Sequence, residues 1–283
     1  RERVALGAWS TGRFDADDFP DFATVDAAGL TVFGGDEHGR FDPARSLRID
    51  LPQAAEHRLE FVDFNRDGRM DVLAVHRPAG RAVVLLAHPE RGLQDRTRLV
   101  LTVPGYMRRP VVDDLDGDGF LDIALPYVPT PSVGAGVRIF FRGEVQVKVP
   151  LFLNRGRQGS FRRSADRVLT LPVRVRLLTE ASGRFALAGV VVVEHRGDLD
   201  GDGRRDLLVT RDPDVLGIHR GVPGSVYEER PSGTVRIPDP SAYASVRSGA
   251  GDLNGDGRSD ILLQYRGRGD RPDRLVLLVS RKN

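Results

Sequence analysis

Residues 252–260 read Asp-Leu-Asn-Gly-Asp-Gly-Arg-Ser-Asp, and this nine-residue pattern decides how the chain folds. Oxygen-bearing side chains stand at positions 1, 3, 5 and 9, and glycine stands at position 6. The same spacing returns at residues 63–71, 114–122 and 198–206. Ca²⁺ prefers roughly six to eight oxygen ligands, and glycine allows the bend that presents the position 7 carbonyl beside the carboxylates. The pattern therefore predicts four calcium-binding loops.

We expect each loop to hold one ion through the side chains at positions 1, 3, 5 and 9 and the backbone carbonyl at position 7. The candidate ligands are Asp63, Asn65, Asp67, Arg69, Asp71, Asp114, Asp116, Asp118, Phe120, Asp122, Asp198, Asp200, Asp202, Arg204, Asp206, Asp252, Asn254, Asp256, Arg258 and Asp260. Crowded carboxylates repel one another, so an ion would remove that repulsion and stabilise the strand that follows. We expect about four Ca²⁺ ions with a structural role and no part in catalysis.

The EF-hand loop opens with the same spacing, but it closes with a glutamate at position 12 and lies between two helices. Here position 12 is apolar in every loop, as Ala74, Leu125, Val209 and Leu263. The segments after the loops are short and apolar with turn residues around them, which favours strands over helices. We therefore expect the ninth-position Asp to close each site from the first residue of a strand.

A decayed fifth copy lies near the N-terminus, at residues 13–21. It has Arg13 in place of the first ligand and Asp18 in place of the glycine. A guanidinium cannot coordinate a cation, and it can neutralise the remaining carboxylates. We expect this loop to be structurally equivalent to the others and free of metal.

The loops recur about every 50 residues, apart from one longer interval between Asp114 and Asp198. Each unit reads as four strands, and the last strand is closed by proline at Leu47–Pro52, Leu99–Pro104, Val168–Pro172 and Val235–Pro238. Proline cannot donate to a strand ladder, so it marks an edge strand or a strand end. Four-stranded units of this length predict an all-β fold, a β-propeller of antiparallel blades with about five blades visible, as a complete ring or as part of a longer one.

We expect a single domain over residues 1–283, with approximate blades at 1–52, 53–104, 105–172, 173–238 and 239–283. Residues 3–9 would form the first strand. The third blade carries an insertion at Tyr127–Val147 that looks like an extra hairpin, either a partner-binding projection or an ornament that pads a neighbouring blade. We expect the last blade to borrow or to lack its outer strand, because the chain ends soon after the apparent third strand at Leu275–Val279.

Composition limits the partners. The chain has a formal net charge of +2 and a pI near 9.2, but its arginines are scattered through turns without aromatic interleaving, so we expect no nucleic acid partner. The acidic residues concentrate in the loops, which leaves a cationic remainder that suits an anionic polysaccharide or an acidic protein surface, or is only a solvated surface. Cysteine is absent. No apolar stretch is long enough to span a bilayer, and calcium loops favour an extracytoplasmic location: secreted, periplasmic or cell surface.

Catalytic motifs are missing from the sequence. The six histidines fall at unrelated positions in the repeats, and there is no Gly-x-Ser-x-Gly elbow or phosphate-cradling glycine loop. We expect no catalytic residues and no enzymatic activity; a glycosidase or lyase is the alternative, because acidic residues are plentiful.

The sequence resembles the FG-GAP and VCBS repeat proteins in the segments Gly251–Leu263 and Gly197–Val209, which follow the Gly-Asp-x-Asn-Gly-Asp-Gly-x-x-Asp-Leu pattern of those repeats. The resemblance implies an integrin-α-like calcium-binding β-propeller that is extracytoplasmic and serves adhesion, ligand recognition or assembly. The expected function is a non-catalytic binding, adhesion or assembly module for protein or polysaccharide. The alternatives are a structural subunit of an envelope or surface complex and a propeller-type enzyme acting on glycans.

Overall fold

The structure is a computed structural model that describes residues 9–26, 29–51, 58–130, 143–156, 161–174, 176–179, 185–188, 193–223 and 226–281. These residues form β-strands and one short 3-10 helix, η2 (Pro240–Ala242), and no α-helix occurs among them. The predicted all-β architecture of four-stranded antiparallel blades is confirmed.

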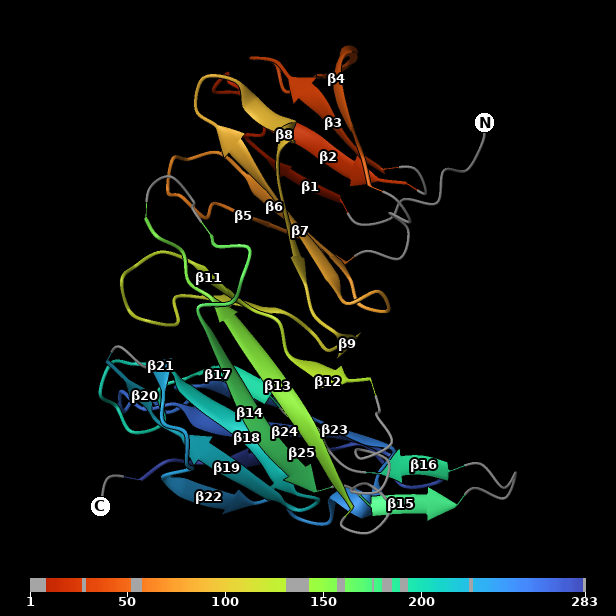
Figure 1. Cartoon of the computed structure of the whole chain (residues 1–283), viewed down its shortest axis with the longest axis vertical. Helices are drawn as coiled ribbons and strands as arrows, with labels where there is room; N and C mark the ends of the chain where they lie inside the picture. Colours follow the sequence, from red (N-terminus) through yellow and green to blue (C-terminus); the bar gives the residue numbers. More distant parts are fainter. Residues whose placement is uncertain are drawn as a thin grey trace. The chain divides into compact units, whose positions relative to one another are not determined.

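The first two repeats each form a four-stranded antiparallel sheet (Figure 1). The first sheet has the order β1-β2-β3-β4, with β1 (Trp9–Gly12), β2 (Asp21–Val25), β3 (Gly29–Gly35) and β4 (Phe41–Asp50). The second has the order β5-β6-β7-β8, with β5 (Arg58–Val62), β6 (Asp71–His76), β7 (Arg81–His88) and β8 (Gly92–Thr102). Residues 3–8 of the predicted first strand lie outside the described residues.

The third repeat departs from the four-stranded pattern. Its strands are β9 (Gly105–Met107), β10 (Val111–Asp113), β11 (Asp122–Ala124), β12 (Tyr127–Pro129), β13 (Glu144–Phe152) and β14 (Arg167–Arg174). They follow the order β10-β11-β13-β12-β9, and β14 pairs with β13. The predicted hairpin strand at Val145–Val149 and the third strand that starts at Leu151 are one continuous strand, because β13 runs on through Pro150, whose fixed φ is compatible with an extended backbone. The other predicted hairpin strand, at residues 137–141, lies outside the described residues.

The fourth repeat forms the sheet β17-β18-β19-β22, with β17 (Val193–Gly197), β18 (Asp206–Asp212), β19 (Val215–His219) and β22 (Gly233–Arg236). Two short hairpins accompany it: β15 (Arg176–Thr179) with β16 (Phe185–Ala188), and β20 (Gly221–Val222) with β21 (Val226–Tyr227).

The last sheet has three strands in the order β23-β24-β25, with β23 (Ser245–Gly251), β24 (Asp260–Arg266) and β25 (Arg274–Leu278). Among the described residues no fourth strand pairs with β25.

The prolines occupy the expected strand ends in two cases. Pro104 and Pro238 follow β8 and β22. Pro172 instead lies inside β14, so the prediction that it ends the strand is wrong. Among the described strands β14 pairs only with β13, and proline within sheets is found mainly on such edge strands.

The chain forms two compact units. One holds the described residues within 1–112, 120–127 and 151–166, and the other holds those within 113–119, 128–150 and 167–283. In the first unit β6 separates two apolar cores: Val72 and Ala74 face one, and Leu73 and Val75 face the other. This follows from the two-residue period of a strand. The prediction of one domain with the stated blade boundaries stays a prediction.

No helix in the described part of the chain is long and apolar enough to cross a membrane.

Candidate functional site

The ninth-position aspartates begin their strands, as predicted: β2, β6, β11, β18 and β24 start at Asp21, Asp71, Asp122, Asp206 and Asp260. All five side chains are at most 2% exposed. Their burial has a clear reason, since the carboxylate binds backbone N–H groups from two parts of the repeat. Asp71 Oδ2 accepts the N–H of Phe64 at 2.8 Å, and its Oδ1 accepts the N–H of Ala87 in β7 at 2.7 Å.

The same two-sided clamp recurs in the other repeats. Asp206 accepts the N–H groups of Leu199 (2.7 Å) and Gly221 (2.9 Å), and Asp260 accepts those of Leu253 (3.2 Å) and Ser280 (2.9 Å). The ninth-position carboxylate thus joins the start of its loop to the chain at or just beyond the third strand. The sequence analysis assigned these residues to the metal alone and missed this role.

The remaining loop side chains turn inward onto their own backbone. In the loop at 198–206, Asp198 accepts the N–H groups of Gly201 at 2.7 Å and Gly203 at 2.8 Å. Asp200 and Asp202 each accept an N–H two residues ahead, at 3.3 and 2.9 Å. The loops that begin at Asp63, Asp114 and Asp252 show the first-position contact to the glycine N–H as well.

Position 4 also adopts a left-handed backbone conformation, which the sequence analysis did not identify. Gly117, Gly201 and Gly255 have φ of 80, 78 and 76°, beside the expected positive φ at position 6. Arg66 holds the same place in the second loop with φ of 56°. The signal was present in the sequence as a second glycine in three of the four loops.

Three loops bring carboxylates close enough to share a cation. The groups are Asp15, Asp17 and Asp21; Asp114, Asp116 and Asp122; and Asp198, Asp200 and Asp206, with ligand oxygens within 4.8 Å of one another. The other two loops carry Asn65 and Asn254 at position 3, and each amide donates to the position 5 carboxylate. These all-oxygen donor sets fit a hard divalent cation such as Ca²⁺.

The electrostatics of two loops also favour a bound cation. Burial raises the pKa of Asp71 to about 7 against the backbone hydrogen bonds that lower it, and the charges of Asp67 and Asp63 add to the rise. Burial likewise raises the pKa of Asp206, with Asp200 and Asp198 contributing. These carboxylates ionise reluctantly beside one another, and a bound cation would relieve that repulsion.

The position 7 residues, predicted to coordinate through their carbonyls, use their side chains elsewhere. The Arg69 guanidinium donates to the carbonyls of Asp17 and Ala16, the latter at 3.0 Å. The ring of Phe120, the position 7 residue of its loop, lies under the Arg66 guanidinium, with 5.4 Å between Arg66 Cζ and the ring centroid. In the next loop, Arg204 Nη1 lies 3.7 Å from Asp202 Oδ2. Coordination by these carbonyls stays a prediction.

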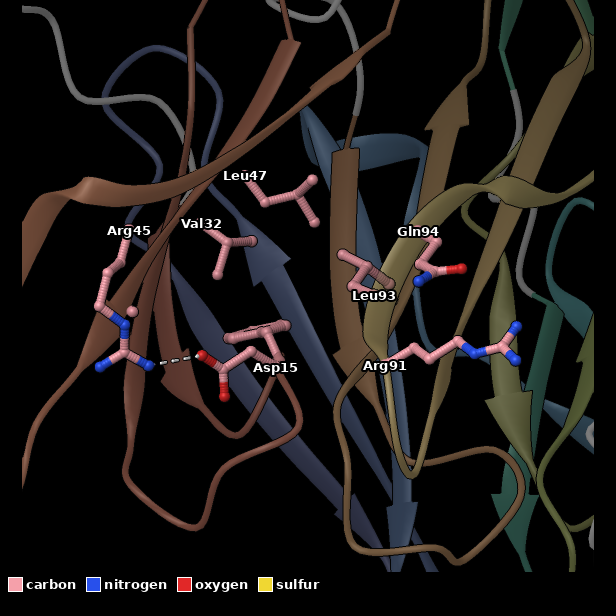
Figure 2. Close-up of a pocket in the computed structure, with 9 residues that line it drawn as sticks. Asp15, Val32, Arg45, Leu47, Arg91, Leu93 and Gln94 are labelled. Atoms are coloured by element: carbon pink, nitrogen blue, oxygen red, sulfur yellow. Dashed lines mark hydrogen bonds and ion pairs between the residues drawn. The ribbon is translucent and has the colours of Figure 1, made fainter.

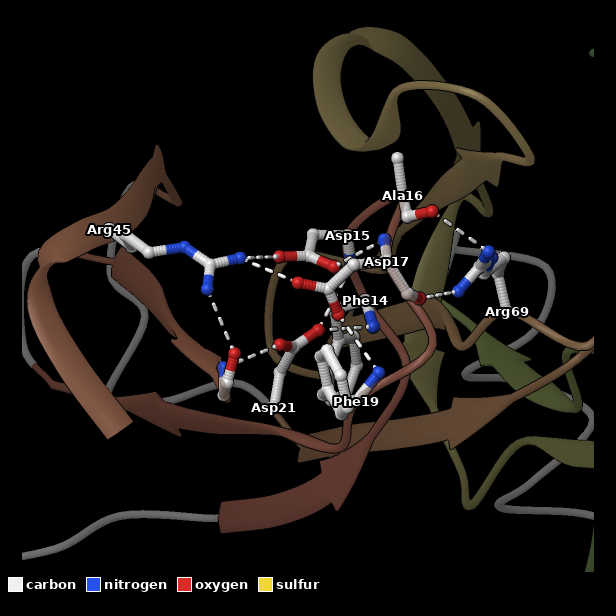
Figure 3. A network of polar contacts seen from close by, with 9 residues as sticks. Phe14, Asp15, Ala16, Asp17, Phe19, Asp21, Arg45 and Arg69 are labelled. Atoms are coloured by element: carbon white, nitrogen blue, oxygen red, sulfur yellow. Dashed lines mark hydrogen bonds and ion pairs between the residues drawn. The ribbon is translucent and has the colours of Figure 1, made fainter. Parts of the chain in front are cut away.

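The first loop contains its own cation, the guanidinium of Arg45 from β4 (Figure 3). Arg45 Nη2 lies 2.6 Å from Asp17 Oδ2 and 3.3 Å from Asp15 Oδ2, and its Nη1 donates to the Gly35 carbonyl at 2.9 Å. Burial acts to raise the pKa of Asp17, but hydrogen bonds from Arg45 and from the Phe19 N–H lower it overall.

Arg13 does not have the neutralising role expected from the sequence. Its guanidinium lies 3.5 Å from Asp18, and both side chains are exposed. Its carbonyl accepts the Met70 N–H at 2.7 Å. The residue that neutralises the loop comes from 28 positions beyond Asp17, too far along the chain for the loop pattern to indicate it.

A cavity of about 570 Å³ lies in the first unit beside this loop (Figure 2). Phe14, Val32, Leu47 and Leu93 supply apolar lining. Its polar lining consists of Asp15, Arg45, Arg91 and Gln94. Asp15 faces Arg45 in an ion pair, so the described lining holds no free acid, nucleophile or histidine, and the arrangement fits binding better than acid–base chemistry. The sequence analysis missed this cavity, because its residues come from a loop and from strands of two different sheets.

Comparison with known proteins identifies the repeats. A model described as FG-GAP-like repeat matches residues 13–74, 63–125 and 198–263. No curated protein sequence matches the chain significantly. Among solved structures, a lectin of Agrocybe aegerita that recognises non-reducing terminal N-acetylglucosamine is 17% identical, with a TM-score of 0.49 over 98% of this chain and 68% of that one. A mutant Tc holotoxin pore of Photorhabdus luminescens is 18% identical, with a TM-score of 0.29 over 96% of this chain and 14% of that one.

The matched segments begin at the first-ligand position of the first, second and fourth loops, which places the decayed loop at 13–21 in the same repeat series as the intact ones. Together the matches cover more than half of the residues, and the chain belongs to the FG-GAP-like repeat family.

Proposed function

We propose that the protein is a non-catalytic, calcium-stabilised β-propeller module that binds a polysaccharide or a protein surface outside the cytoplasm. The observation that carries the proposal is the cavity beside the first loop, whose apolar lining and ion-paired polar side chains suit a polar ligand with an apolar face. A saccharide unit has both kinds of surface. The cavity volume, about 570 Å³, falls in the usual range for small-ligand sites.

The absence of catalytic chemistry is part of the proposal. Hydrolysis of a glycan requires two carboxyl groups across the scissile bond, one of them free to donate a proton. Asp15 is the one carboxyl residue in the cavity lining, and Arg45 pairs with it. Catalysis therefore has no acid and base pair to work with in this cavity.

Calcium is proposed as the structural cofactor of the four intact loops. Residues at positions 1, 3, 5 and 9 would hold it, and it would supply positive charge that allows the carboxylates to remain ionised together. The excess of basic over acidic residues outside the loops supports an anionic polysaccharide or an acidic protein as ligand. The lectin among the similar structures agrees with this choice but carries no weight by itself.

A direct test combines a glycan array with calorimetry on calcium-loaded protein. We expect a hit on the array, binding of that glycan weakened at least fivefold by Arg91→Ala in the cavity, and unchanged binding in Arg109→Ala, which removes an exposed arginine elsewhere. Incubation with the same glycan should release no shorter products.

Released oligosaccharides would contradict the non-catalytic role. A blank array together with a protein partner captured independently of Arg91 would favour the alternative role as a structural subunit of a surface assembly.

A further inference from the structure

A second cavity, of about 430 Å³, lies in the unit that holds residues 167–283. Its volume falls in the usual range for small-ligand sites. Four segments of that unit line it: Leu171 and Pro172 of β14, residues 209–211 of β18, Gly217 and His219 of β19, and residues 229–231 before β22. The cavity shares no lining residue with the one beside the first loop.

The cavity lies on one face of the sheet β17-β18-β19-β22. Leu208 and Leu216 of this sheet pack in a core with residues of β24. Side chains alternate between the two faces of a strand, so Val209 and Gly217 belong to the opposite face. These two residues pair with each other across β18 and β19. Because Gly217 has no side chain, the sheet surface is hollow at this point.

The hollow at Gly217 adjoins a histidine ring. A Cβ atom on Gly217 would lie 3.3 Å from Pro231 Cβ and 3.8 Å from His219 Nε2. The backbone of Gly217 is not in the left-handed region, so its conformation does not require glycine. The missing side chain therefore leaves space beside the Nε2 atom of His219.

His219 presents a buried hydrogen-bonding atom to this space. The residue is 6% exposed, and its Nδ1 lies 2.9 Å from the carbonyl oxygen of Glu228. A carbonyl oxygen can only accept, so Nδ1 carries a hydrogen and the Nε2 of the neutral ring keeps its lone pair. Within the described part of the chain nothing hydrogen-bonds to Nε2. It can accept a hydrogen bond from a hydroxyl group of a bound molecule.

The charged part of the lining favours an anion. Arg211 and Arg230 are exposed, and neither forms an ion pair with a described residue. Glu229, the acidic residue of the described lining, lies 3.6 Å from Arg167, which is outside the cavity. Guanidinium groups bind carboxylates through paired N–H donors, so the two arginines suit a carboxylate.

A metal ion fits this cavity less well, although a histidine lines it. The acidic groups able to share a cation in the described ranges are three aspartate clusters, and none of them includes His219 or Glu229. The charges of Arg211 and Arg230 would also repel a cation.

We infer that this cavity binds a small hydroxy acid, that is, an organic carboxylate with a hydroxyl group. The carboxylate binds Arg211 and Arg230 at the exposed part of the lining. The apolar body of the ligand packs against Leu171 and Pro231, and its hydroxyl group donates to His219 Nε2 in the space beside Gly217.

Calorimetry on the full chain with calcium tests the site with two pairs of probes. Each pair is a hydroxy acid and the same acid without the hydroxyl: para-hydroxybenzoate with benzoate, and ω-hydroxyhexanoate with hexanoate. We expect at least one hydroxy acid to bind, and its partner to bind about tenfold more weakly, because His219 Nε2 then stays without a hydrogen bond.

Glycine substitutions locate the binding. Gly217→Ala places a methyl group between Pro231 and His219 Nε2 and should abolish binding. The matched control is Gly249→Ala in β23, where an added Cβ would meet no atom within 4 Å. Binding should be unchanged in Gly249→Ala and in Arg91→Ala, which alters the other cavity.

Side-chain substitutions test the roles of the polar groups. In His219→Asn the amide N–H can replace Nδ1 toward the Glu228 carbonyl, but no atom replaces Nε2, so the preference for the hydroxy acid should disappear. Arg211→Gln and Arg230→Gln should weaken both acids of a pair alike. These three variants carry the test if circular dichroism shows that Gly217→Ala is unfolded.

Three results would overturn the inference: neither hydroxy acid binds at millimolar concentration, binding persists in folded Gly217→Ala, or the preference for the hydroxyl group persists in His219→Asn.

Discussion

At the scale of single residues, the most instructive case is the first loop, where an arginine side chain pairs with two of the carboxylates. Arg45 bridges two carboxylates that stand at ligand positions 3 and 5, while Asp21 at position 9 still accepts N–H groups from Phe14 and Gly35. The loop therefore retains its shape with a cation supplied by its own sheet. Arg69 of the next loop adds two hydrogen bonds to its backbone.

Replacement of this internal cation should destabilise the first loop. Arg45→Met leaves Asp15 and Asp17 facing each other without a counter-charge, so we expect a lower melting temperature in chelator, with a smaller loss at high salt. The matched control is Arg48→Met, which removes an exposed ion pair with Asp26 from the same strand. Equal melting curves for the two variants would show that Arg45 is only a surface charge.

A second residue-scale prediction concerns backbone strain in the second loop. Arg66 has φ of 56° at a position where three loops carry glycine. Arg66→Gly should raise the unfolding free energy by about 1 kcal/mol because a side chain in the left-handed region is strained. The lost contact with Phe120 offsets part of the gain. The check is a chemical denaturation curve, with Arg108→Gly as an exposed control.

At the scale of elements, the ninth-position aspartate connects strands as well as loops. Because the carboxylate accepts N–H groups from the start of the loop and from the chain at or beyond the third strand, it holds the second and third strands in register without any metal. The prediction that each ninth-position Asp is the first residue of a strand is confirmed. Its hydrogen bonds could not be foreseen, because Gly221 is 15 residues away from Asp206.

Two substitutions in one loop separate this clamp from metal binding. Asp206→Ala leaves two N–H groups without partners at a buried site, so we expect it to lower the unfolding free energy by about 2–5 kcal/mol with calcium or with chelator. Asp202→Ala, at the partly exposed fifth position, should destabilise the protein mainly when calcium is present. Thermal melts with calcium and with chelator measure the stability of both variants. If Asp206→Ala lowers the melting temperature only with calcium and not with chelator, Asp206 acts as a metal ligand alone and the clamp is contradicted.

At the scale of the whole molecule, the fold is a series of repeat sheets, each with an acidic loop between two of its strands. Every one of these loops buries its ninth-position Asp, and burial raises the pKa of Asp71 and Asp206. We expect bound cations to stabilise the sheets by keeping these carboxylates ionised together.

Removal of calcium should therefore affect the molecule as a whole. A site at a ligand concentration about 100 times its Kd adds about 2.7 kcal/mol to the unfolding free energy. With four such sites, chelation should lower the melting temperature by many degrees, and added calcium should restore it. Calorimetry should count four ions. An unchanged melting curve would contradict metal-dependent folding, and a count of five would contradict the metal-free first loop.

The sequence by itself determined the repeat, the strand that starts at each ninth-position Asp and the all-β class. These features depend on residue type and spacing over fewer than about ten positions, where turn chemistry and side-chain alternation act locally. The extra hairpin was predicted wrongly at Val145–Val149 because β13 continues through Pro150, and a local pattern does not show where one strand ends and the next begins.

Only the tertiary structure decided which arginine pairs with the carboxylates of the first loop, which backbone groups the buried aspartates bind and where the cavity lies. Each of these depends on residues brought together from distant parts of the chain. The sequence does not distinguish Arg13 from Arg45 as the partner of the loop carboxylates. The pairing of β4 with β3 brings Arg45 to Asp17.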